Sequence, residues 1–274
     1  TDMNSVVYIA GVAETALGKV EGQTELSMVA LAAREALAEA GMVLRDVDAL
    51  FTNYMPEVGS DCGSVRVGEY LGISPKYSDC SDLGGAAFEG FVNHAILALS
   101  AGRCECALIV YASRQRSRKN RPRAFAPDVY SITGQFEQPY GLAFPISQYA
   151  LCAARHMYQY GTTSAQLAQV AVSARKWAAL NPKAWCRTPL TVDEVLASPM
   201  ISDPLHQLDC CLVTDGGGAI VLTTAARARN AAKKPVRILG TGESQCAYHV
   251  SQIPDVTVTP GAASARDAFA MAGI

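Results

Sequence analysis

The sequence predicts an α/β protein with a mainly parallel or mixed sheet covered by helices. Short apolar runs typical of buried strands alternate with longer runs whose apolar residues recur at helical spacing. Of the 274 residues, 50% are hydrophobic and only 18% are charged, which suits a protein with a large core. Because strands separated by helices pair mostly in parallel, both faces of the sheet need a helical layer.

The first expected elements are a strand at Val6–Val12 and a helix at Glu25–Ala40. Thr24 stands where a helix N-cap is expected, and Gly41 stands where a left-handed residue would end the helix. A short strand follows at Asp48–Tyr54. The three segments therefore form a strand, a helix and a second strand at the start of the sheet.

The most informative segment is Ser81–Ser113. It opens with Ser-Asp-Leu-Gly-Gly, continues as an amphipathic helix at Ala86–Ser100, breaks at Gly102 and enters a buried strand at Ala107–Ala112. A helix N-terminus reached through glycines presents unpaired N–H groups and the positive end of the helix dipole. Such a turn can stabilise a thiolate, an enolate or a thioester oxygen, although a tight connection without chemistry is the simpler alternative.

A polar excursion over about residues 113–207 is expected to form a cap or insertion that carries specificity. It contains helical runs at Ile146–Tyr160 and Ser164–Leu180, and a capping box opens a short helix at Thr191. Beyond it, strands and helices alternate again. We expect a core strand through Thr223, a helix to Lys233, a strand at Val236–Gly240 and a helix at Ala262–Ala272. No internal repeat is evident.

Composition narrows the class of protein. The net charge of −2 and the pI near 6.1 argue against a nucleic-acid or anionic-membrane partner. The apolar run Phe91–Ala101 is too short to span a membrane, and the first residues do not read as a secretion signal. The nine cysteines are odd in number and scattered, without zinc-site spacing, so we expect free thiols in the cytoplasm and no metal site.

Several runs of residues together carry a family resemblance. One run extends from Gly84-Gly-Ala-Ala through Gly102 to Ala107-Leu-Ile-Val-Tyr111, and a second is Asp209–Ala219. Further matches lie at Ala154–Gly161, Asn181-Pro182 and Ser198–Leu205. The first run resembles the nucleophile helix of thiolases, the second resembles the Asp-Gly-Ala turn of the sterol-carrier thiolase-like branch, and the others resemble its loop domain.

This resemblance implies a thiolase-like fold made of two duplicated halves. Residues 1–230 would be the N-terminal half, including a loop-domain insertion at about 113–207, and residues 231–274 would begin the C-terminal half, which would continue beyond Ile274. The resemblance also implies a homodimer, an acyl-CoA substrate and no cofactor besides that thioester.

One departure from the family pattern affects the expected chemistry. The position of the acyl-accepting cysteine falls on Gly85, which cannot be a nucleophile. Cys80 lies five residues earlier and is a candidate reactive thiol, with a buried structural thiol as the alternative. Gly84 and Gly85 remain candidates for binding the thioester oxygen through the backbone.

Two further groups are candidate site residues. Tyr248 and His249 follow the strand that ends near Gly240, in a loop that the resemblance places near the mouth of the site, and either can exchange a proton with a substrate. An ordinary polar loop is the alternative. The other three histidines, His94, His156 and His206, are better explained as structural side chains with hydrogen-bond partners.

A basic cluster begins the excursion and comprises Arg114, Arg116, Arg118, Lys119, Arg121 and Arg123. Arg114, Arg116 and Lys119 are candidates for binding the phosphates of coenzyme A, with a solvated loop as the alternative. Aromatic side chains are not interleaved with these charges, so single-stranded nucleic acid is a poor match.

Three functions follow. The first is a thiolase-like acyl-CoA enzyme that makes or breaks a carbon–carbon bond beside a thioester, without the usual cysteine. The second is a cysteine-independent retro-aldolase acting on a β-hydroxyacyl-CoA. The third is a non-catalytic acyl-CoA or lipid-binding subunit that works with a partner, since some thiolase-like proteins pair with a small OB-fold acyl-CoA-binding protein.

Overall fold

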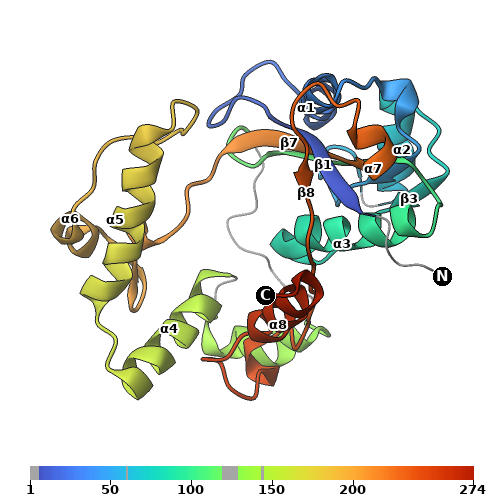
Figure 1. Cartoon of the computed structure of the whole chain (residues 1–274). Helices are drawn as coiled ribbons and strands as arrows, with labels where there is room; N and C mark the ends of the chain where they lie inside the picture. The colour runs from blue at the N-terminus through green and yellow to red at the C-terminus, as the bar shows by residue number, and fades with distance from the viewer. Residues whose placement is uncertain (1–5, 60, 119–128, 143–144) are drawn as a thin grey trace. The chain divides into compact units, whose positions relative to one another are not determined.

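The structure, a computed structural model, describes residues 6–59, 61–118, 129–142 and 145–274. Figure 1 shows the chain. It consists of two compact units. The first unit is assembled from three segments, Thr1–Arg118, Thr214–Glu243 and Ala263–Ile274, and the second from two segments, Lys119–Val213 and Ser244–Ala262. The second unit thus combines most of the expected insertion with a later segment that the sequence assigned to the beginning of the C-terminal half.

The first unit contains a six-stranded sheet with the order β3-β2-β4-β7-β1-β8. Its strands are β1 (Val7–Glu14), β2 (Ala49–Phe51), β3 (Tyr77–Asp79), β4 (Cys106–Arg114), β7 (Asp215–Thr224) and β8 (Val236–Arg237). β2 runs parallel to β3 and β4, whereas β7 is antiparallel to β4 and β1, and β1 is antiparallel to β8. The sheet is therefore mixed. Its long pairings are antiparallel because β7 lies between β4 and β1 and runs opposite to both.

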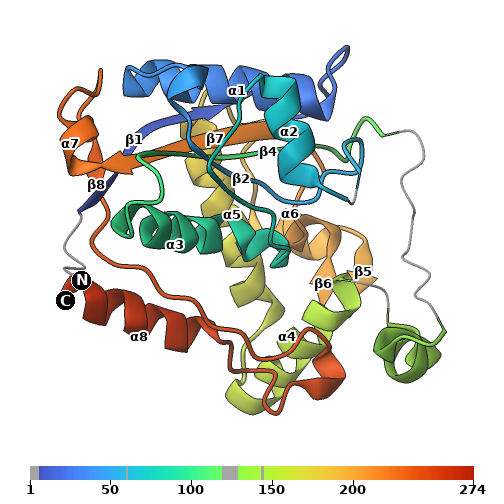
Figure 2. The same cartoon turned by 90° about the vertical axis from the view of Figure 1, so that its right-hand side faces the viewer.

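Helices cover both faces of this sheet, as expected (Figure 2). α1 (Glu25–Ala40) and α2 (Gly63–Leu71) pack on one face, and α3 (Ala87–Ser100) packs on the other. β4 shows why its sequence is continuously apolar. Leu108 and Val110 join the cluster under α1, while Ala107 and Ile109 join the cluster under α3, so successive side chains are buried on opposite faces.

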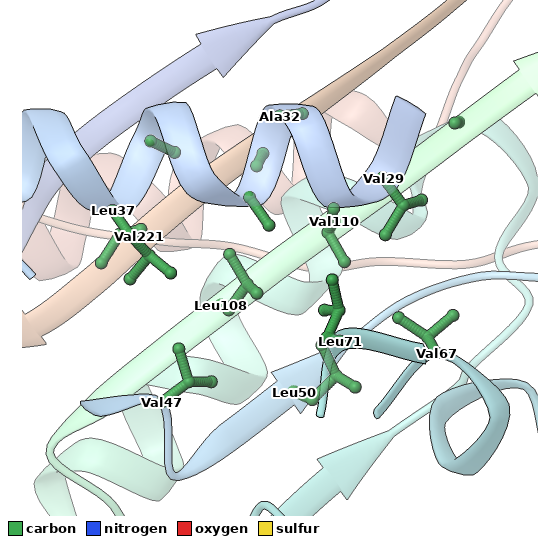
Figure 3. Close-up of a cluster of buried hydrophobic side chains, with 14 of the residues drawn as sticks. Val29, Ala32, Leu37, Val47, Leu50, Val67, Leu71, Leu108, Val110 and Val221 are labelled. Carbon is green, nitrogen blue, oxygen red and sulfur yellow. The ribbon is translucent and has the colours of Figure 1, made fainter. Parts of the chain in front are cut away.

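The core under α1 consists of apolar side chains from six elements, β1, α1, β2, α2, β4 and β7, and from the connections between them; Figure 3 labels several of these side chains. Val29 and Leu37 of α1 meet Leu108 and Val221 of the sheet, and all four are essentially inaccessible to solvent. Each such side chain contributes about 1.5–3 kcal/mol relative to leaving it exposed. This burial is what holds α1 on the sheet.

α1 begins and ends where the sequence predicted. The Thr24 side chain accepts a hydrogen bond from the Ser27 N–H, and the Ser27 side chain in turn accepts one from the Thr24 N–H. At the other end, Gly41 adopts a left-handed φ of 70°, and the Met42 N–H returns to the Leu37 carbonyl. Both caps satisfy backbone groups that the helix leaves unpaired.

The second unit is mostly helical. It contains a π-helical turn at Thr133–Glu137, α4 (Ile146–Tyr160), α5 (Ser164–Leu180), α6 (Val192–Ala197), and the small hairpin of β5 (Met200–Ser202) and β6 (Leu205–His206). The expected bounds of α4 and α5 are confirmed, and α6 is capped by Thr191. A small core of Ala168, Val172 and Val195 joins α5 to α6.

Two expectations about the last segments were wrong. The helix expected up to Lys233 is only the single turn α7 (Ala225–Ala228), and the strand expected at Val236–Gly240 ends as β8 at Arg237. An internal repeat also exists. Ala265-Arg-Asp-Ala-Phe-Ala-Met-Ala-Gly-Ile274, most of which lies in α8 (Gly261–Ala272), repeats Ala33-Arg-Glu-Ala-Leu-Ala-Glu-Ala-Gly-Met42 with six of ten residues identical.

The repeat extends to the strand on which each helix packs. A Cβ added to Gly11 in β1 would lie 2.0 Å from the Ala36 carbonyl oxygen of α1. A Cβ added to Gly240, just after β8, would lie 2.2 Å from the Ala268 carbonyl oxygen of α8. In both places only glycine allows the extended chain to approach the helix backbone this closely.

Candidate active site

The N-terminus of α3 is open to solvent. Gly84–Ala86 form a single 3₁₀ turn that leads into the helix, and all three residues are exposed. Gly84 has a φ of 62°, which favours glycine, and its N–H donates to Asp82 Oδ1 over 3.1 Å. The first N–H groups of a helix have no acceptor within the helix itself, so this turn has the chemistry to bind an anionic oxygen.

Gly85 is not required by packing. A Cβ built on it would have no heavy atom within 4 Å, and Gly85 is not among the glycines with left-handed φ. A side chain at this position would therefore enter open space without backbone strain. The departure from the family's cysteine is a chemical difference that the surrounding structure does not impose.

Cys80 lies between β3 and this turn, against the first turn of α2, where its Sγ is 3.1 Å from the Cβ position of Gly63. Cys80 is an exposed residue, so the structure does not show the buried structural thiol offered as the alternative. Partial burial of its sulfur nevertheless raises the pKa of the thiol. The Ser64 N–H opposes this effect, but the carboxylates of Asp79 and Asp82 add to it, and the net shift is upward. A thiol with a raised pKa is protonated at neutral pH, unlike the thiolates that act as nucleophiles.

A polar network joins β3, α3 and the segment after β8. His94 Nδ1 lies 2.6 Å from Asp79 Oδ2, and His94 Nε2 lies 3.5 Å from Glu243 Oε2. Thr241 donates to Asn93 over 2.8 Å, and Asn93 donates to Glu243 over 3.4 Å. The expectation that His94 is a structural histidine with hydrogen-bond partners is confirmed.

The basic residues expected to bind phosphate are partly engaged within the protein. Arg114 Nη1 lies 2.8 Å from Glu57 Oε1, and both side chains are mostly buried. The Arg116 N–H donates to Asp215 Oδ1 over 2.8 Å. Lys119 lies outside the described residues. Arg114 therefore forms an ion pair within the protein, and Glu57 partly neutralises the charge that a phosphate would meet.

Asp215 holds the end of β4 to the start of β7. It is fully buried and accepts hydrogen bonds from the N–H groups of Val20, Arg116 and Ser117, and from the Ser117 hydroxyl. Burial by itself would raise the pKa of Asp215, but the hydrogen bonds from Ser117, Val20 and Arg116 outweigh it and leave the pKa below its ordinary value. The turn that the family resemblance suggested here is not a tight turn, because Asp215-Gly-Gly-Gly218 already form the first residues of β7, with the buried Asp215 carboxylate as their anchor.

Glu25 and Glu57 form a pair that the sequence analysis missed. The Glu25 N–H donates to Glu57 Oε2 over 2.9 Å, and the Glu57 N–H donates to Glu25 Oε2 over 2.7 Å. Burial raises the pKa of Glu25, and the N–H groups of Glu57 and Arg114 only partly oppose this. The two residues are 32 positions apart, and each reads as an ordinary surface acid, so no sequence signal pointed to the pair.

In the second unit, His249 belongs to a buried polar cluster. Its Nδ1 lies 3.0 Å from Thr133 Oγ1 and 3.5 Å from Glu137 Oε2. Glu137 ends the π-helical turn and is completely buried. Tyr248 lies beside the imidazole, with ring centroids 5.0 Å apart, and is 68% exposed. A buried carboxylate next to a partly accessible histidine and an exposed tyrosine can carry proton-transfer chemistry.

The candidate residues are therefore divided between the two units. Cys80, Gly84, Gly85, Arg114 and Arg116 belong to the first unit, and Tyr248 and His249 belong to the second. Sequence reasoning missed Glu137. A signal was present, because Glu137 is an isolated acid directly after Phe136 in a loop, but a solvated loop acid has the same appearance.

Comparison with known proteins gives a consistent family. No protein-family model matches the chain. The chain is 35% identical over 239 residues to the 17-hydroxy-3-oxo-4-pregnene-20-carboxyl-CoA lyase of Mycobacterium tuberculosis, a match that covers 84% of this chain and 60% of the lyase. It thus spans less than two thirds of the length of that relative.

Solved structures share the fold over nearly the whole chain. The Ltp2-ChsH2(DUF35) aldolase is 32% identical, with a TM-score of 0.86 over 98% of this chain and 70% of that one. A monomeric SCP2-thiolase like protein from Mycobacterium smegmatis is 19% identical, with a TM-score of 0.76 over 98% of this chain and 57% of that one. The second likeness concerns the fold alone.

Proposed function

This chain belongs to the thiolase superfamily, in the sterol-carrier thiolase-like branch, and on that premise we propose that it breaks a carbon–carbon bond beside a CoA thioester without forming an acyl-enzyme. The observation that carries this proposal is Gly85 at the exposed N-terminus of α3. The backbone there can bind an oxyanion, but it offers no side chain to accept an acyl group.

The reaction that fits is the retro-aldol cleavage of a β-hydroxyacyl-CoA. A base removes the proton of the β-hydroxyl, the new carbonyl forms as the Cα–Cβ bond breaks, and the electron pair passes into the thioester as an enolate. Protonation at Cα then yields a shorter acyl-CoA, and the other product is a ketone or an aldehyde. The N–H groups of Gly85 and Ala86 are assigned the enolate oxygen, because the Gly84 N–H already donates to Asp82.

The base is assigned to the Tyr248 and His249 pair of the second unit. His249 Nδ1 contacts Thr133, so Nε2, on the opposite side of the ring, is the nitrogen assigned to the substrate. Tyr248 lies beside the His249 ring and is exposed. His249 takes the proton, and Tyr248 hydrogen-bonds to the substrate hydroxyl. An imidazole can accept a proton near neutral pH, and a tyrosine hydroxyl can exchange one with a hydrogen-bonded substrate group.

A thiolase route through Cys80 is the competing mechanism. It requires a thiolate, whereas burial and the neighbouring carboxylates raise the pKa of Cys80. The raised pKa argues for the cysteine-independent route. A non-catalytic acyl-CoA-binding role would use the same α3 turn and would differ only in the absence of turnover.

The substrate is proposed to be a CoA thioester whose acyl group is a steroid that carries the thioester on its side chain, because the lyase named above acts on such a compound. Arg116 and Lys119 are assigned to bind the phosphates of CoA. Arg114 makes a smaller contribution, because its positive charge is partly neutralised by Glu57. No cofactor beyond the thioester enters this reaction.

Two partners complete the proposal. A homodimer would form through β3, the strand at one of the two edges of the sheet. A small OB-fold protein of the DUF35 kind would bring the acyl-CoA, as the composition of the Ltp2-ChsH2(DUF35) aldolase suggests. In the described part of the chain, no helix is long and apolar enough to cross a membrane. A cytoplasmic site of action is also proposed, on the odd and scattered set of cysteines.

The test is a product assay on the full chain, alone and with a DUF35 partner, using a steroid β-hydroxyacyl-CoA in which the steroid side chain carries the thioester. Retro-aldol cleavage predicts equal amounts of a ketone or aldehyde and a shortened acyl-CoA, and an unchanged intact-protein mass. An acyl adduct on any cysteine would instead support the thiolase route. If the acyl-CoA binds but no products form even with the partner present, the chain acts as a non-catalytic acyl-CoA-binding subunit.

Gly85→Cys provides a sharper test of the same turn. Because a side chain at this position enters open space, the variant should fold normally and should place a thiol at the N-terminus of α3. The helix dipole lowers the pKa of thiols at such positions. After incubation with acetyl-CoA, we expect an acetyl adduct on the introduced thiol, detected by intact mass and peptide mapping. Wild type and the matched control Ala101→Cys, at the other end of α3, should carry none.

A further inference from the structure

Glu137 is the only acidic side chain of the second unit's described residues that is completely buried. It lies at the end of a π-helical turn, an irregularity that recurs at functional sites. Burying a carboxylate costs free energy unless hydrogen-bond donors surround it. The groups around Glu137 therefore indicate its role.

The neighbours of Glu137 come from two other segments, and Gln148 and Ser251 among them are hydrogen-bond donors. Gln148 of α4 donates its amide N–H to Oε2 over 3.0 Å. The Ser251 N–H and hydroxyl both approach Oε1 at 3.4 Å. His249 Nδ1 approaches Oε2 at 3.5 Å. These donors supply hydrogen bonds to both oxygens of the buried carboxyl group.

This arrangement selects one form of the imidazole. If Nδ1 of a neutral His249 carried a lone pair, it could accept from the Thr133 hydroxyl at 3.0 Å, but the lone pair would also face the Glu137 carboxylate oxygen at 3.5 Å. If Nδ1 carries the proton, it donates toward Thr133 Oγ1 at 3.0 Å and toward Glu137 at 3.5 Å. The second form is favoured electrostatically, and it leaves the lone pair on Nε2.

We propose that Glu137 is a positioning residue that holds neutral His249 in the Nδ1–H tautomer, so that Nε2 is free to accept the proton of a substrate hydroxyl. The inference rests on the proposed function for the identity of that substrate, but the tautomer itself is a property of the protein alone. The groups facing His249 are Glu137 and Thr133 of the π-helical turn and Tyr248 of its own segment.

The first experiment is a ¹⁵N spectrum of the full chain with labelled histidine, at a pH where the imidazoles are neutral. Only four histidines are present, and His249→Asn identifies the resonances of interest. We expect the Nδ1–H form of His249 in wild type. An Nε2–H form in wild type would overturn the proposal, whether or not any variant can be prepared.

Glu137→Gln tests the cause. The glutamine amide is about the size of the carboxylate but carries no negative charge, so we expect a mixture of the two His249 tautomers. The matched control is Glu243→Gln, which removes a carboxylate lying 3.5 Å from the ring of His94 in the first unit. This control should leave the His249 resonances unchanged. An unchanged tautomer in Glu137→Gln would also contradict the proposal.

Kinetics separate positioning from a merely structural role. For β-hydroxyacyl-CoA cleavage, we expect Glu137→Gln to lower kcat on the order of 10²-fold with KM nearly unchanged, since the base is present but misdirected. Losing the negative charge also disfavours the imidazolium, so the acid limb of the pH profile should move to lower pH. Glu137→Asp should restore part of kcat, and equal losses in Gln and Asp variants would contradict the role.

The two proposals fail in different ways. If wild type shows the Nδ1–H form and Glu137→Gln abolishes it, but no cleavage is detected, the proposed function fails and the positioning role stands. If cleavage occurs and neither the tautomer nor the pH profile responds to Glu137→Gln, the positioning role fails and the proposed function stands.

Discussion

The segment from β1 to α1 and the segment from β8 to α8 have the same local design but different surroundings. Each has a glycine that lets an extended chain touch a helix backbone, and each helix ends in a left-handed glycine, Gly41 or Gly273. In both, the residue after that glycine returns its N–H to a helix carbonyl. Yet α1 has eight buried residues, whereas α8 has none.

The difference between the two helices is clearest at one pair of equivalent positions. Leu37 of α1 is 1% exposed because β4 and β7 lie beneath it, whereas Phe269 of α8 is 55% exposed. Local sequence is therefore enough to form the helix, end it and dock it on its own strand. Burial of the apolar face depends on strands that come from elsewhere in the chain.

The largest effect is expected from adding a methyl group where the chain touches each helix. In Gly11→Ala, the new Cβ meets backbone atoms of a helix that is fixed by its buried face, so we expect a loss of about 3 kcal/mol or more in the free energy of unfolding. In Gly240→Ala, α8 can move away, and the expected loss is only about 1–2 kcal/mol. Urea unfolding measures both, and equal losses would mean that α8 is held as firmly as α1.

Removal of the apolar side chain at the equivalent positions should separate the two helices more cleanly. Leu37→Ala leaves a cavity in a packed core and should cost about 2–5 kcal/mol. Phe269→Ala removes a side chain that is more than half exposed and should stay within about 0.5 kcal/mol. The same denaturation experiment gives both numbers. A large loss in Phe269→Ala would show that solvent does not cover this side of α8.

The helix ends should behave alike, because their geometry is local. Gly41 and Gly273 have φ values of 70° and 76°, which cost an L-residue with a side chain about 1 kcal/mol. We expect Gly41→Ala and Gly273→Ala to lose about that much each, with any excess at Gly41, where the Ala232 N lies 3.3 Å from the added Cβ. Hydrogen exchange of the last turn of each helix reports the losses separately.

The smallest effect concerns pH and should appear only in the β1–α1 region. α1 starts with the buried Glu25, whose pKa is raised, whereas the first turn of α8 has no acidic residue. A raised folded-state pKa favours the protonated carboxyl in the native protein. Its contribution is fully present below the ordinary pKa of 4.5 and is lost as the pH rises through the folded-state value.

Glu25→Gln should remove this dependence. Its stability relative to wild type should increase as the pH is raised from 4.5, because the amide does not ionise. Unfolding in urea at several pH values measures the difference. Glu21→Gln is the comparison variant: Glu21 is a nearby exposed acid whose pKa is lowered by Lys19, so the stability of Glu21→Gln relative to wild type should not increase with pH. A difference between wild type and Glu25→Gln that does not vary with pH would count against this assignment.

The sequence predicted where several candidate site residues lie along the chain, but not which groups surround them in the folded protein. The glycine turn before α3 was found because Gly84-Gly85 interrupts two regular patterns, and the structure confirms an exposed 3₁₀ turn there. The state of Cys80, the pairing of Arg114 with Glu57, and the burial of Glu137 were not predictable. Each depends on groups distant in sequence, and electrostatic effects depend on distance in space.

What the sequence determined by itself is the set of local and periodic features: the bounds of α1, α4 and α5, the caps of α1, the buried β4, the helix N-terminus at Gly85 and the superfamily that these runs resemble. What only the tertiary structure decided is which residues meet. β7 enters antiparallel between β4 and β1, Asp215 anchors the end of β4, and Glu137 faces His249. Local propensity and capping act within a few residues of chain, whereas burial and ion pairing are settled only when distant segments exclude water from each other.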